Sequence, residues 1–311
     1  MPQVLITGAG GLVGHALRGL LPGARFAARA DADLTDLAAV ERLFEETRPE
    51  KVVHLAADVG GVKKNAARNA DLLASNALIN THVLNVAARR GVSRLVSVLS
   101  SCAYAFYPDR PTTESDLHIG LPFAGNLGYG YSKRMLDVQT HLLAEQYGCR
   151  FSTITPATIF GPNDDWDLED GHVLGSLIHK CFLAKRDGKP LEVWGSGRAV
   201  RQFVYSRDVA RVLVAALDSF DGPGSTIVSD GPGITIGDLA RAVARAMDFD
   251  GPIVFDASKP EGALVRVIKS EAFERRFPGF MFTRFEDALR ETARWFADNA
   301  GDCVLSSAGA R

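Results

Sequence analysis

The chain has 311 residues, of which 46% are hydrophobic and 23% are charged. This composition excludes a small disulfide-stapled scaffold, an intrinsically disordered chain and a collagen-like or coiled-coil chain. The 35 basic and 37 acidic residues leave a formal net charge of -2, so no global positive field would recruit nucleic acid or an anionic membrane. We therefore expect a small-molecule partner, no nucleic acid and no membrane.

The cysteines and the N-terminus indicate a cellular compartment. No stretch reaches the roughly 18 apolar residues of a membrane span, and the N-terminus leads into a short apolar run without a charged targeting region. The four cysteines, Cys102, Cys149, Cys181 and Cys303, have neither paired nor metal-like spacing. We expect a cytoplasmic protein with reduced thiols and no metal.

The first half of the chain alternates short β-rich runs with longer segments of helical period. Strands are predicted at residues 3–7, 25–28, 51–56, 94–100 and 151–155, and helices at 12–21, 37–47, 72–90 and 129–147. This alternation is typical of the α/β class, and it predicts a doubly wound parallel Rossmann sheet with helices on both faces.

The second half has more glycine- and proline-marked loops. Helices are predicted at residues 173–185, 206–219, 236–247 and 284–298. We expect residues 1–160 to form the nucleotide-binding Rossmann domain, with a return segment near 200–228, and residues 161–311 to form a smaller mixed substrate-binding lobe. Residues 300–311 are small and polar enough to form a frayed tail.

A glycine-rich loop joins the first predicted strand to the first predicted helix. Gly8, Gly11 and Gly14 form a Gly-x-x-Gly-x-x-Gly pattern. In such a loop the first glycine permits a tight turn, the second lets the backbone approach a pyrophosphate and the third lets helix and strand pack closely. The free N–H groups of the helix N-terminus, which begins at Leu12 and Val13, favour an anion. The pattern predicts a dinucleotide site.

The end of the second strand selects the cofactor, because an acidic residue there would bind the 2′-hydroxyl of NAD. Arg29 stands at this point instead, and a guanidinium suits the 2′-phosphate of NADP. We predict NADP(H), with an ordinary exposed arginine as the alternative interpretation of Arg29. Asp33 and Leu34 are expected beside the adenine, although Asp33 would serve equally as the cap of the next helix.

Tyr129 and Lys133 begin a predicted helix with four-residue spacing, which places both on one face. A nearby ammonium would stabilise the tyrosinate, so that the phenol exchanges a proton near neutral pH, while the lysine also holds the nicotinamide ribose. A surface pair is the alternative. Ser100 ends the fourth strand at the sheet edge where open α/β folds bind ligands, and it can hydrogen-bond a substrate oxygen.

With these three motifs in this order, the chain resembles the extended short-chain dehydrogenase/reductase superfamily. Six further stretches, residues 31–36, 54–61, 100–102, 171–174, 193–197 and 201–203, make it similar to the GDP-L-fucose synthase family. The resemblance implies a bifunctional 3,5-epimerase and 4-reductase that acts on GDP-4-keto-6-deoxy-D-mannose with NADPH. It also implies a homodimer packed through two long helices.

The resemblance assigns Ser100, Tyr129 and Lys133 to the reductase centre, and Cys102 and His172 to the acid/base pair of epimerisation. A C4 ketone acidifies the hydrogens on C3 and C5, so each centre inverts if one group removes a proton and another returns it on the opposite face. Thiol and imidazole both exchange protons near neutral pH. The structural alternatives are a buried apolar role for Cys102 and a helix-capping role for His172.

The remaining residues implied by the resemblance contact cofactor or substrate. Ala56 and Ala57 are expected at the cofactor, and Ser101, Lys180, Trp194, Arg201 and Lys269 at the substrate. A guanidinium fork at Arg201 would clamp the pyrophosphate, and Trp194 would cover the base or the sugar. A tryptophan that only fills the space between lobes is the alternative for Trp194. Asn76 is a weaker candidate, for anchoring a helix.

Some stretches depart from the family pattern and leave alternatives open. The stretch 103–108 after Cys102 contains an apparent insertion, and Pro156-Ala157-Thr158, residues 163–166 and Gly175 also differ. These changes leave open a 4-ketoreductase or a single-site epimerase acting on a related GDP-hexose or GDP-heptose. A 4,6-dehydratase would carry an Asp-Glu pair where Ser101 and Cys102 stand. A non-catalytic NADP-sensing module would have no need of the proton donor Tyr129.

Overall fold

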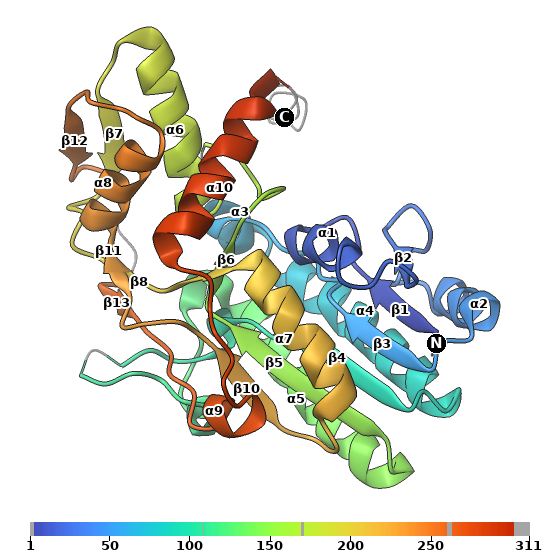
Figure 1. Ribbon diagram of the computed structural model, residues 1–311. Helices are drawn as coiled ribbons and strands as arrows, with labels where there is room; N and C mark the ends of the chain where they lie inside the picture. Colours follow the sequence, from blue (N-terminus) through green and yellow to red (C-terminus); the bar gives the residue numbers. More distant parts are fainter. Residues whose placement is uncertain (1–2, 108, 169–170, 260–262, 302–311) are drawn as a thin grey trace.

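Six parallel strands form the central sheet, in the order β10-β5-β4-β3-β1-β2 (Figure 1). Their bounds are β1 Val4–Thr7, β2 Arg25–Ala27, β3 Lys51–His54, β4 Arg94–Val98, β5 Arg150–Pro156 and β10 Ser225–Val228. The strand β1 is buried along its whole length, as expected for a parallel sheet covered on both faces. The predicted doubly wound sheet is confirmed.

The computed structural model describes residues 3–107, 109–168, 171–259 and 263–301, with backbone alone at 62–64. The predicted tail beyond residue 301, and with it Cys303, lies outside the described residues. No described helix is long and apolar enough to cross a membrane.

Helices cover both faces of the sheet (Figure 1). On one face α1 (Leu12–Arg18) packs beside α7 (Ser206–Ser219), and on the other α4 (Asn69–Arg89) lies between α2 (Leu37–Thr47) and α5 (Leu127–Tyr147). The helix α1 ends three residues earlier than expected, because the chain turns at Gly19, which caps it. The other long helices begin and end within three residues of their predicted bounds.

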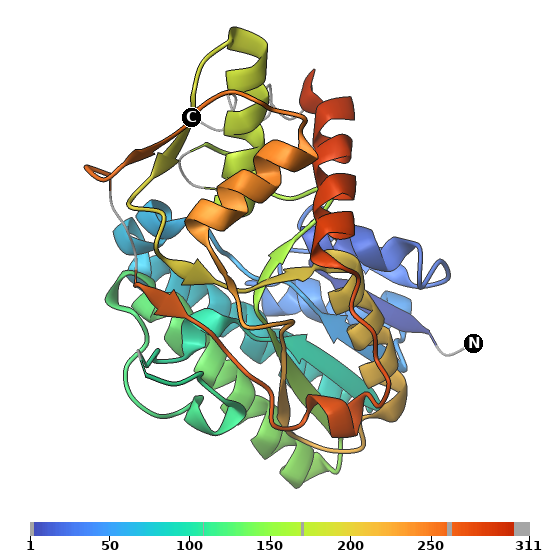
Figure 2. The same ribbon diagram turned by 60° about the vertical axis from the view of Figure 1, so that its left-hand side comes forward.

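A second lobe lies beyond the carboxyl ends of the sheet strands (Figures 1 and 2). It contains α6 (Val173–Asp187), α8 (Ile236–Ala246) and α10 (Phe285–Asp298), together with the parallel pair β7 (Leu191–Trp194) and β12 (Ile253–Asp256). Its own apolar core includes Trp166, which packs on Phe296 at 4.6 Å between ring centroids.

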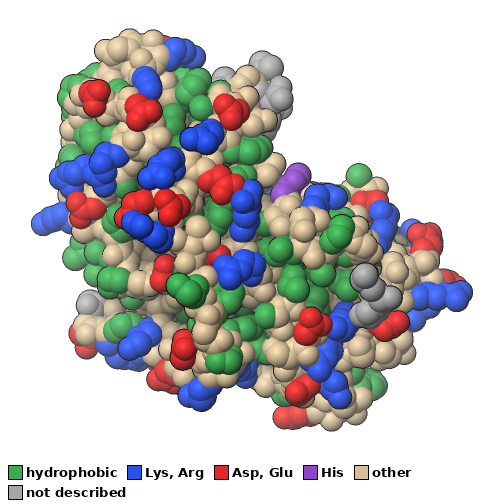
Figure 3. All heavy atoms as spheres, viewed as in Figure 1, with side chains coloured by type: hydrophobic (Ala, Val, Ile, Leu, Met, Phe, Trp, Pro, Cys, Tyr) green, Lys and Arg blue, Asp and Glu red, His purple; other side chains and the backbone are tan. Residues whose placement is uncertain are grey.

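Several further short elements were not predicted from the sequence patterns. They are α3 Val62–Ala67, η1 Ser101–Ala103, η2 Glu114–Asp116, η3 Ala124–Asn126, β6 Thr158–Phe160, β8 Val200–Arg201, β9 Phe203–Tyr205, β11 Ile234–Thr235, β13 Val265–Arg266 and α9 Phe273–Arg276. After β9 the chain returns to the sheet, where α7 covers one face and β10 pairs with β5. On the face shown in Figure 3, basic and acidic side chains are interspersed.

Candidate active site

A cavity of about 1140 Å³ opens at the carboxyl ends of β1, β3, β4 and β5 and extends to the second lobe. Nearly all residues singled out from the sequence line it: Gly8, Gly11, Leu12, Val13, Gly14, Arg29, Asp33, Leu34, Ala56, Ala57, Ser100, Ser101, Cys102, Tyr129, Lys133, His172, Lys180, Trp194 and Arg201. Lys269 and Asn76 do not line it. The side chain of Lys269 is exposed, and its backbone N–H donates to the carbonyl of Thr112. Asn76 is buried in α4, where its side chain donates to the backbone carbonyls of Asp58 and Leu72.

The glycine loop is built for close approach of backbone to backbone. Gly8 has a φ of +72°, and a Cβ there would lie 2.6 Å from the backbone nitrogen of Ala56. A Cβ on Gly14 would lie 2.6 Å from the carbonyl oxygen of Ala9. The loop thus leaves the first turn of α1 open towards the cavity, and this cradle fits the pyrophosphate of a dinucleotide.

The segment after β2 favours the NADP interpretation. Asp31 accepts hydrogen bonds from Arg25 and from the backbone N–H of Ala28, both at 2.8 Å. Asp33 accepts one from the Thr35 hydroxyl at 2.7 Å. Asp36, and not Asp33, caps α2. Both carboxylates, Asp31 and Asp33, thus accept hydrogen bonds from neighbouring residues. Arg29 is exposed at the cavity wall, where its positive charge suits a 2′-phosphate.

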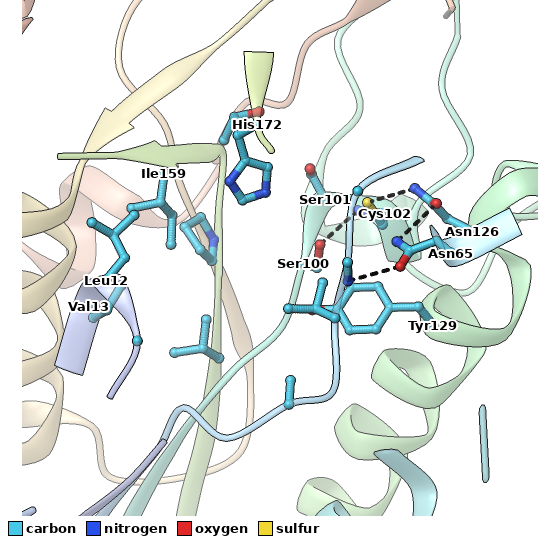
Figure 4. A pocket seen from close by; sticks show the side chains of 18 of the residues that line it. Leu12, Val13, Asn65, Ser100, Ser101, Cys102, Asn126, Tyr129, Ile159 and His172 are labelled. Carbon is cyan, nitrogen blue, oxygen red and sulfur yellow. Dashed lines mark hydrogen bonds between the residues drawn. The ribbon is translucent and has the colours of Figure 1, made fainter. Parts of the chain in front are cut away.

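The serine of the predicted reductase centre lies where β4 gives way to the turn η1. The Oγ of Ser100 accepts a hydrogen bond from the backbone N–H of Cys102 at 3.2 Å (Figure 4). A hydroxyl donates as well as accepts, so Ser100 can still donate to a ketone oxygen. The turn therefore aims Ser100 and Cys102 into the same part of the cavity.

Tyr129 and Lys133 are buried on one face of α5, but their electrostatics differ from expectation. Burial raises the pKa of the Tyr129 phenol; the nearby Cys102 adds to the rise and the Ser100 hydroxyl opposes it. Burial also lowers the pKa of Lys133 to about 8. The ammonium donates to the carbonyl of Val98 at 2.8 Å and lies 5.7 Å from the centre of the Tyr129 ring. Tyr129 thus keeps its proton at neutral pH, because loss of solvent penalises the tyrosinate.

Cys102 is half-buried and lines the cavity, so it is not a fully buried apolar side chain. Its sulfur accepts a hydrogen bond from Nδ2 of Asn126 at 3.3 Å, and Asn126 is bonded in turn to Asn65 (Figure 4). Neither asparagine was singled out from the sequence. Asn126 lies 24 positions from Cys102 and 61 positions from Asn65, so no local spacing predicts these two contacts. The only local signal is that Asn65 is a polar residue just after the stretch 54–61 and Asn126 one just before Tyr129.

His172 precedes α6 and points into the cavity (Figure 4). Its side chain makes no capping hydrogen bond, so the alternative interpretation of a helix cap is not supported. The Nδ1 atom lies 3.5 Å from the carboxylate of Asp164, whose side chain is only 2% exposed. Asp164 raises the pKa of His172 through this contact and its charge, while burial opposes the rise. Asp164 also was not singled out from the sequence.

Cations and aromatic rings line the far end of the cavity. The ammonium of Lys180 lies 4.1 Å from the centre of the Trp194 ring, and Arg201 reaches the same wall. Arg266, three residues from the expected Lys269, lines the cavity beside the ring of Phe106, with 4.8 Å between its guanidinium carbon and the ring centre. Its Nε and Nη2 are buried and have no hydrogen-bond partner among the described residues. Such a guanidinium suits an anionic ligand.

Comparison with known proteins agrees with this geometry. The model of the NAD dependent epimerase/dehydratase family matches residues 4–229. A probable GDP-L-fucose synthase of Drosophila melanogaster is 37% identical over 96% of this chain and 98% of its own length. The GDP-L-fucose synthase of Dictyostelium discoideum is 35% identical over 95% of both chains. The chain belongs to the GDP-L-fucose synthase branch of this family.

A solved structure of the GDP-L-fucose synthase family has the same fold. The GDP-L-fucose synthetase of Naegleria fowleri bound to NADP is 34% identical and superposes with a TM-score of 0.91, over 96% of this chain and 94% of that chain. The family resemblance inferred from the motifs is therefore confirmed, and the resemblance extends across both lobes.

Proposed function

We propose that the chain uses NADPH to epimerise a GDP-4-keto-6-deoxy sugar at C3 and C5 and to reduce it at C4, giving GDP-L-fucose. The observation that carries this proposal is the meeting of two proton-transfer sets in one cavity. Ser100, Tyr129 and Lys133 line it together with Cys102 and His172. A reductase alone has no need of the second set.

The cofactor side of the cavity has a place for each part of NADP. The glycine loop and the N-terminus of α1 hold the pyrophosphate, Ala56 and Ala57 line the adjoining wall, and Arg29 meets the 2′-phosphate. Asp33 and Leu34 flank the adenine. Lys133 holds the nicotinamide ribose. When bound there, NADPH supplies the hydride for C4.

Epimerisation requires a proton to leave C3 or C5 and another to arrive from the opposite face. Cys102 takes the proton, Ser100 and Tyr129 donate to the enolate oxygen, and His172 returns a proton. The raised pKa of His172 beside Asp164 supports its part as the acid. In the reduction that follows, Tyr129 gives its proton to the C4 oxygen, and its raised pKa keeps the phenol protonated until that step.

The GDP moiety lies along the second lobe. Arg201 and Lys180 neutralise the pyrophosphate, Trp194 covers the base or the sugar, and Ser101 contacts the sugar. We assign to Arg266 the substrate contact that the family resemblance implied for Lys269. We accordingly divide the chain into a Rossmann domain of residues 1–160 with the return segment near 200–228, from which Ser101 and Arg201 reach the substrate, and a substrate-binding lobe formed by the remainder.

We also propose a cytoplasmic homodimer. Exposed apolar side chains follow one stripe of α5 at Leu127, Tyr131, Val138 and Leu142, and Leu78 of the adjacent α4 is 46% exposed. Two long helices with such a surface suit a self-complementary interface. Cys102, Cys149 and Cys181 are free thiols, and a catalytic thiol suits a reducing compartment.

A single variant tests whether the two chemistries are separate. With GDP-4-keto-6-deoxy-D-mannose, Cys102→Ser should lose solvent-hydrogen incorporation while NADPH oxidation continues. The assay combines absorbance of NADPH with mass spectrometry of the product. Equal loss of both activities contradicts the division of labour, and NADPH binding without any turnover in the wild-type protein favours the sensing module or another sugar.

A further inference from the structure

A chain of three hydrogen bonds leads from the backbone to the sulfur of Cys102. The N–H of Gly60 donates to Oδ1 of Asn65 at 3.0 Å. Nδ2 of Asn65 donates to Oδ1 of Asn126 at 3.2 Å, and Nδ2 of Asn126 donates to the Cys102 sulfur at 3.3 Å (Figure 4). Both asparagines are 4% exposed, so water does not compete for these bonds.

The direction of this chain follows from its first member. A backbone N–H can only donate, so the atom of Asn65 that faces Gly60 is its oxygen. The Asn65 amino group then faces Asn126, whose facing atom must be oxygen as well. The amino group of Asn126 is thereby turned towards Cys102. The backbone of the loop after β3 thus determines that the sulfur receives a donor and not an acceptor.

The same residue links the two proton-transfer sets. Asn126 ends η3 and immediately precedes α5, which carries Tyr129 and Lys133. Its side chain makes no capping hydrogen bond to that helix. The amide is therefore not needed to begin α5, and its buried donor is directed to the sulfur instead. A donor to sulfur stabilises negative charge there and holds the side chain in one orientation.

We propose that Asn126 is a positioning residue that holds the Cys102 sulfur ready to accept a proton from the sugar, with Asn65 orienting the Asn126 amide. The proposal rests on the proposed function, in which Cys102 removes the proton from C3 or C5. The proton passes from carbon to the thiolate sulfur, which becomes a thiol, and the electron pair of the broken C–H bond enters the enolate. Asn126 neither gains nor loses a proton in this step and keeps its hydrogen bond to the sulfur.

The test compares two rates in each variant. Proton removal is measured as deuterium incorporation from heavy water into GDP-4-keto-6-deoxy-D-mannose with NADP⁺ present, where no reduction occurs. Hydride transfer is measured as NADP⁺-dependent oxidation of GDP-L-fucose. We expect Asn126→Ala to lower the ratio of the deuterium-exchange rate to the hydride-transfer rate roughly tenfold. This is part of the roughly hundredfold or more that a positioned acid or base typically contributes. The isosteric Asn126→Asp, which faces the sulfur with a carboxylate, should lower it further.

Asn69→Ala is the matched control. Asn69 also meets the start of α5, through a 2.9 Å bond from the backbone N–H of Gly128, but it does not contact Cys102. The control should leave the ratio unchanged, whereas Asn65→Ala should lower it. An unchanged ratio in both Asn126 variants, or equal loss of both rates, overturns the proposal.

A second readout does not depend on the substrate. Iodoacetamide labelling of the Cys102 peptide, followed by mass spectrometry, should be slower in Asn126→Asp than in the wild-type protein, because the thiolate is the reacting form. Equal labelling rates overturn the proposal. If the wild-type protein neither exchanges nor reduces the sugar, the proposed function fails, and slower labelling still supports the contact between Asn126 and the sulfur.

Discussion

At the scale of single residues, the acid/base assignment depends on the neighbours of each group. His172 is half exposed, and the buried carboxylate of Asp164 lies 3.5 Å from its Nδ1. That carboxylate raises the pKa of His172, so a larger share of His172 is protonated at neutral pH. The oxygen of Asp164 nearest the imidazole, Oδ1, also accepts a hydrogen bond from the backbone N–H of Asp165 at 2.8 Å, while Oδ2 is buried and has no hydrogen-bond partner among the described residues.

Replacing Asp164 tests this assignment. In Asp164→Asn the pKa of His172 should fall, because the amide removes the negative charge that favours the imidazolium. His172 must be protonated to return a proton, so the alkaline limb of the epimerisation profile should move to lower pH. The profile is measured as deuterium exchange against pH, with NADPH binding as the control. An unmoved alkaline limb would show that Asp164 does not set the charge of His172.

Arg29 carries the cofactor preference in this account. A hydrogen bond to a charged group contributes about 1.5–3 kcal/mol, which corresponds to roughly a ten- to hundredfold change in affinity. We expect Arg29→Ala to raise the Kd for NADPH by about that factor and to leave the Kd for NADH nearly unchanged. Both are measured by quenching of protein fluorescence. An equal rise in the Kd for both cofactors would show that Arg29 does not contact the 2′-phosphate.

The sequence predicted residues whose contacts are local and missed those whose contacts are distant. The glycine loop and the pair Tyr129 and Lys133 could be identified because their geometry follows from neighbours along one strand or helix. Asn65 contacts Asn126 across 61 positions, and Asp164 lies eight positions before His172, which is farther than the three- or four-residue spacing of a helix. Arg266 lines the cavity from β13, a two-residue strand that is too short to be recognised from the sequence.

At the scale of elements, close packing of β1 against α1 decides whether the nucleotide cradle forms. Long amphipathic segments and buried strands were predictable because their period is visible over many residues. The short pairs β8 with β11 and β6 with β9 were not, since two or three residues carry no period. For strands this short, side-chain packing in the folded protein counts for more than local propensity.

A methyl group at Gly14 tests the packing of α1. In Gly14→Ala the new Cβ would lie 2.6 Å from the carbonyl oxygen of Ala9, so backbone must move. We expect unfolding free energy to fall by about 1–3 kcal/mol, as for overpacked sites, together with weaker NADPH binding. Urea unfolding and fluorescence titration measure the two effects. Gly19→Ala, at the open other end of α1, is the control and should change stability by less than about 1 kcal/mol.

At the scale of the whole molecule, both lobes line the cavity, and the exposed apolar stripe of α5 with the adjacent α4 is the surface that we propose for dimerisation. Leu142 is 57% exposed in the apolar stripe of α5. We expect Leu142→Glu to convert the dimer to a monomer in sedimentation velocity, because a charge in an isologous interface is buried twice. Val254→Glu, at a 48% exposed site on β12, should leave the mass unchanged. A monomeric wild-type protein would contradict the dimer.

The central claim is that one cavity performs two inversions and one reduction. The most direct measurement incubates the protein with GDP-4-keto-6-deoxy-D-mannose and NADPH in heavy water and determines the mass and stereochemistry of the product. The account predicts a reduced sugar with two non-exchangeable deuteriums from solvent, at C3 and C5. A reduced sugar with one deuterium or none would contradict it, and would identify a single-site epimerase or a simple 4-ketoreductase.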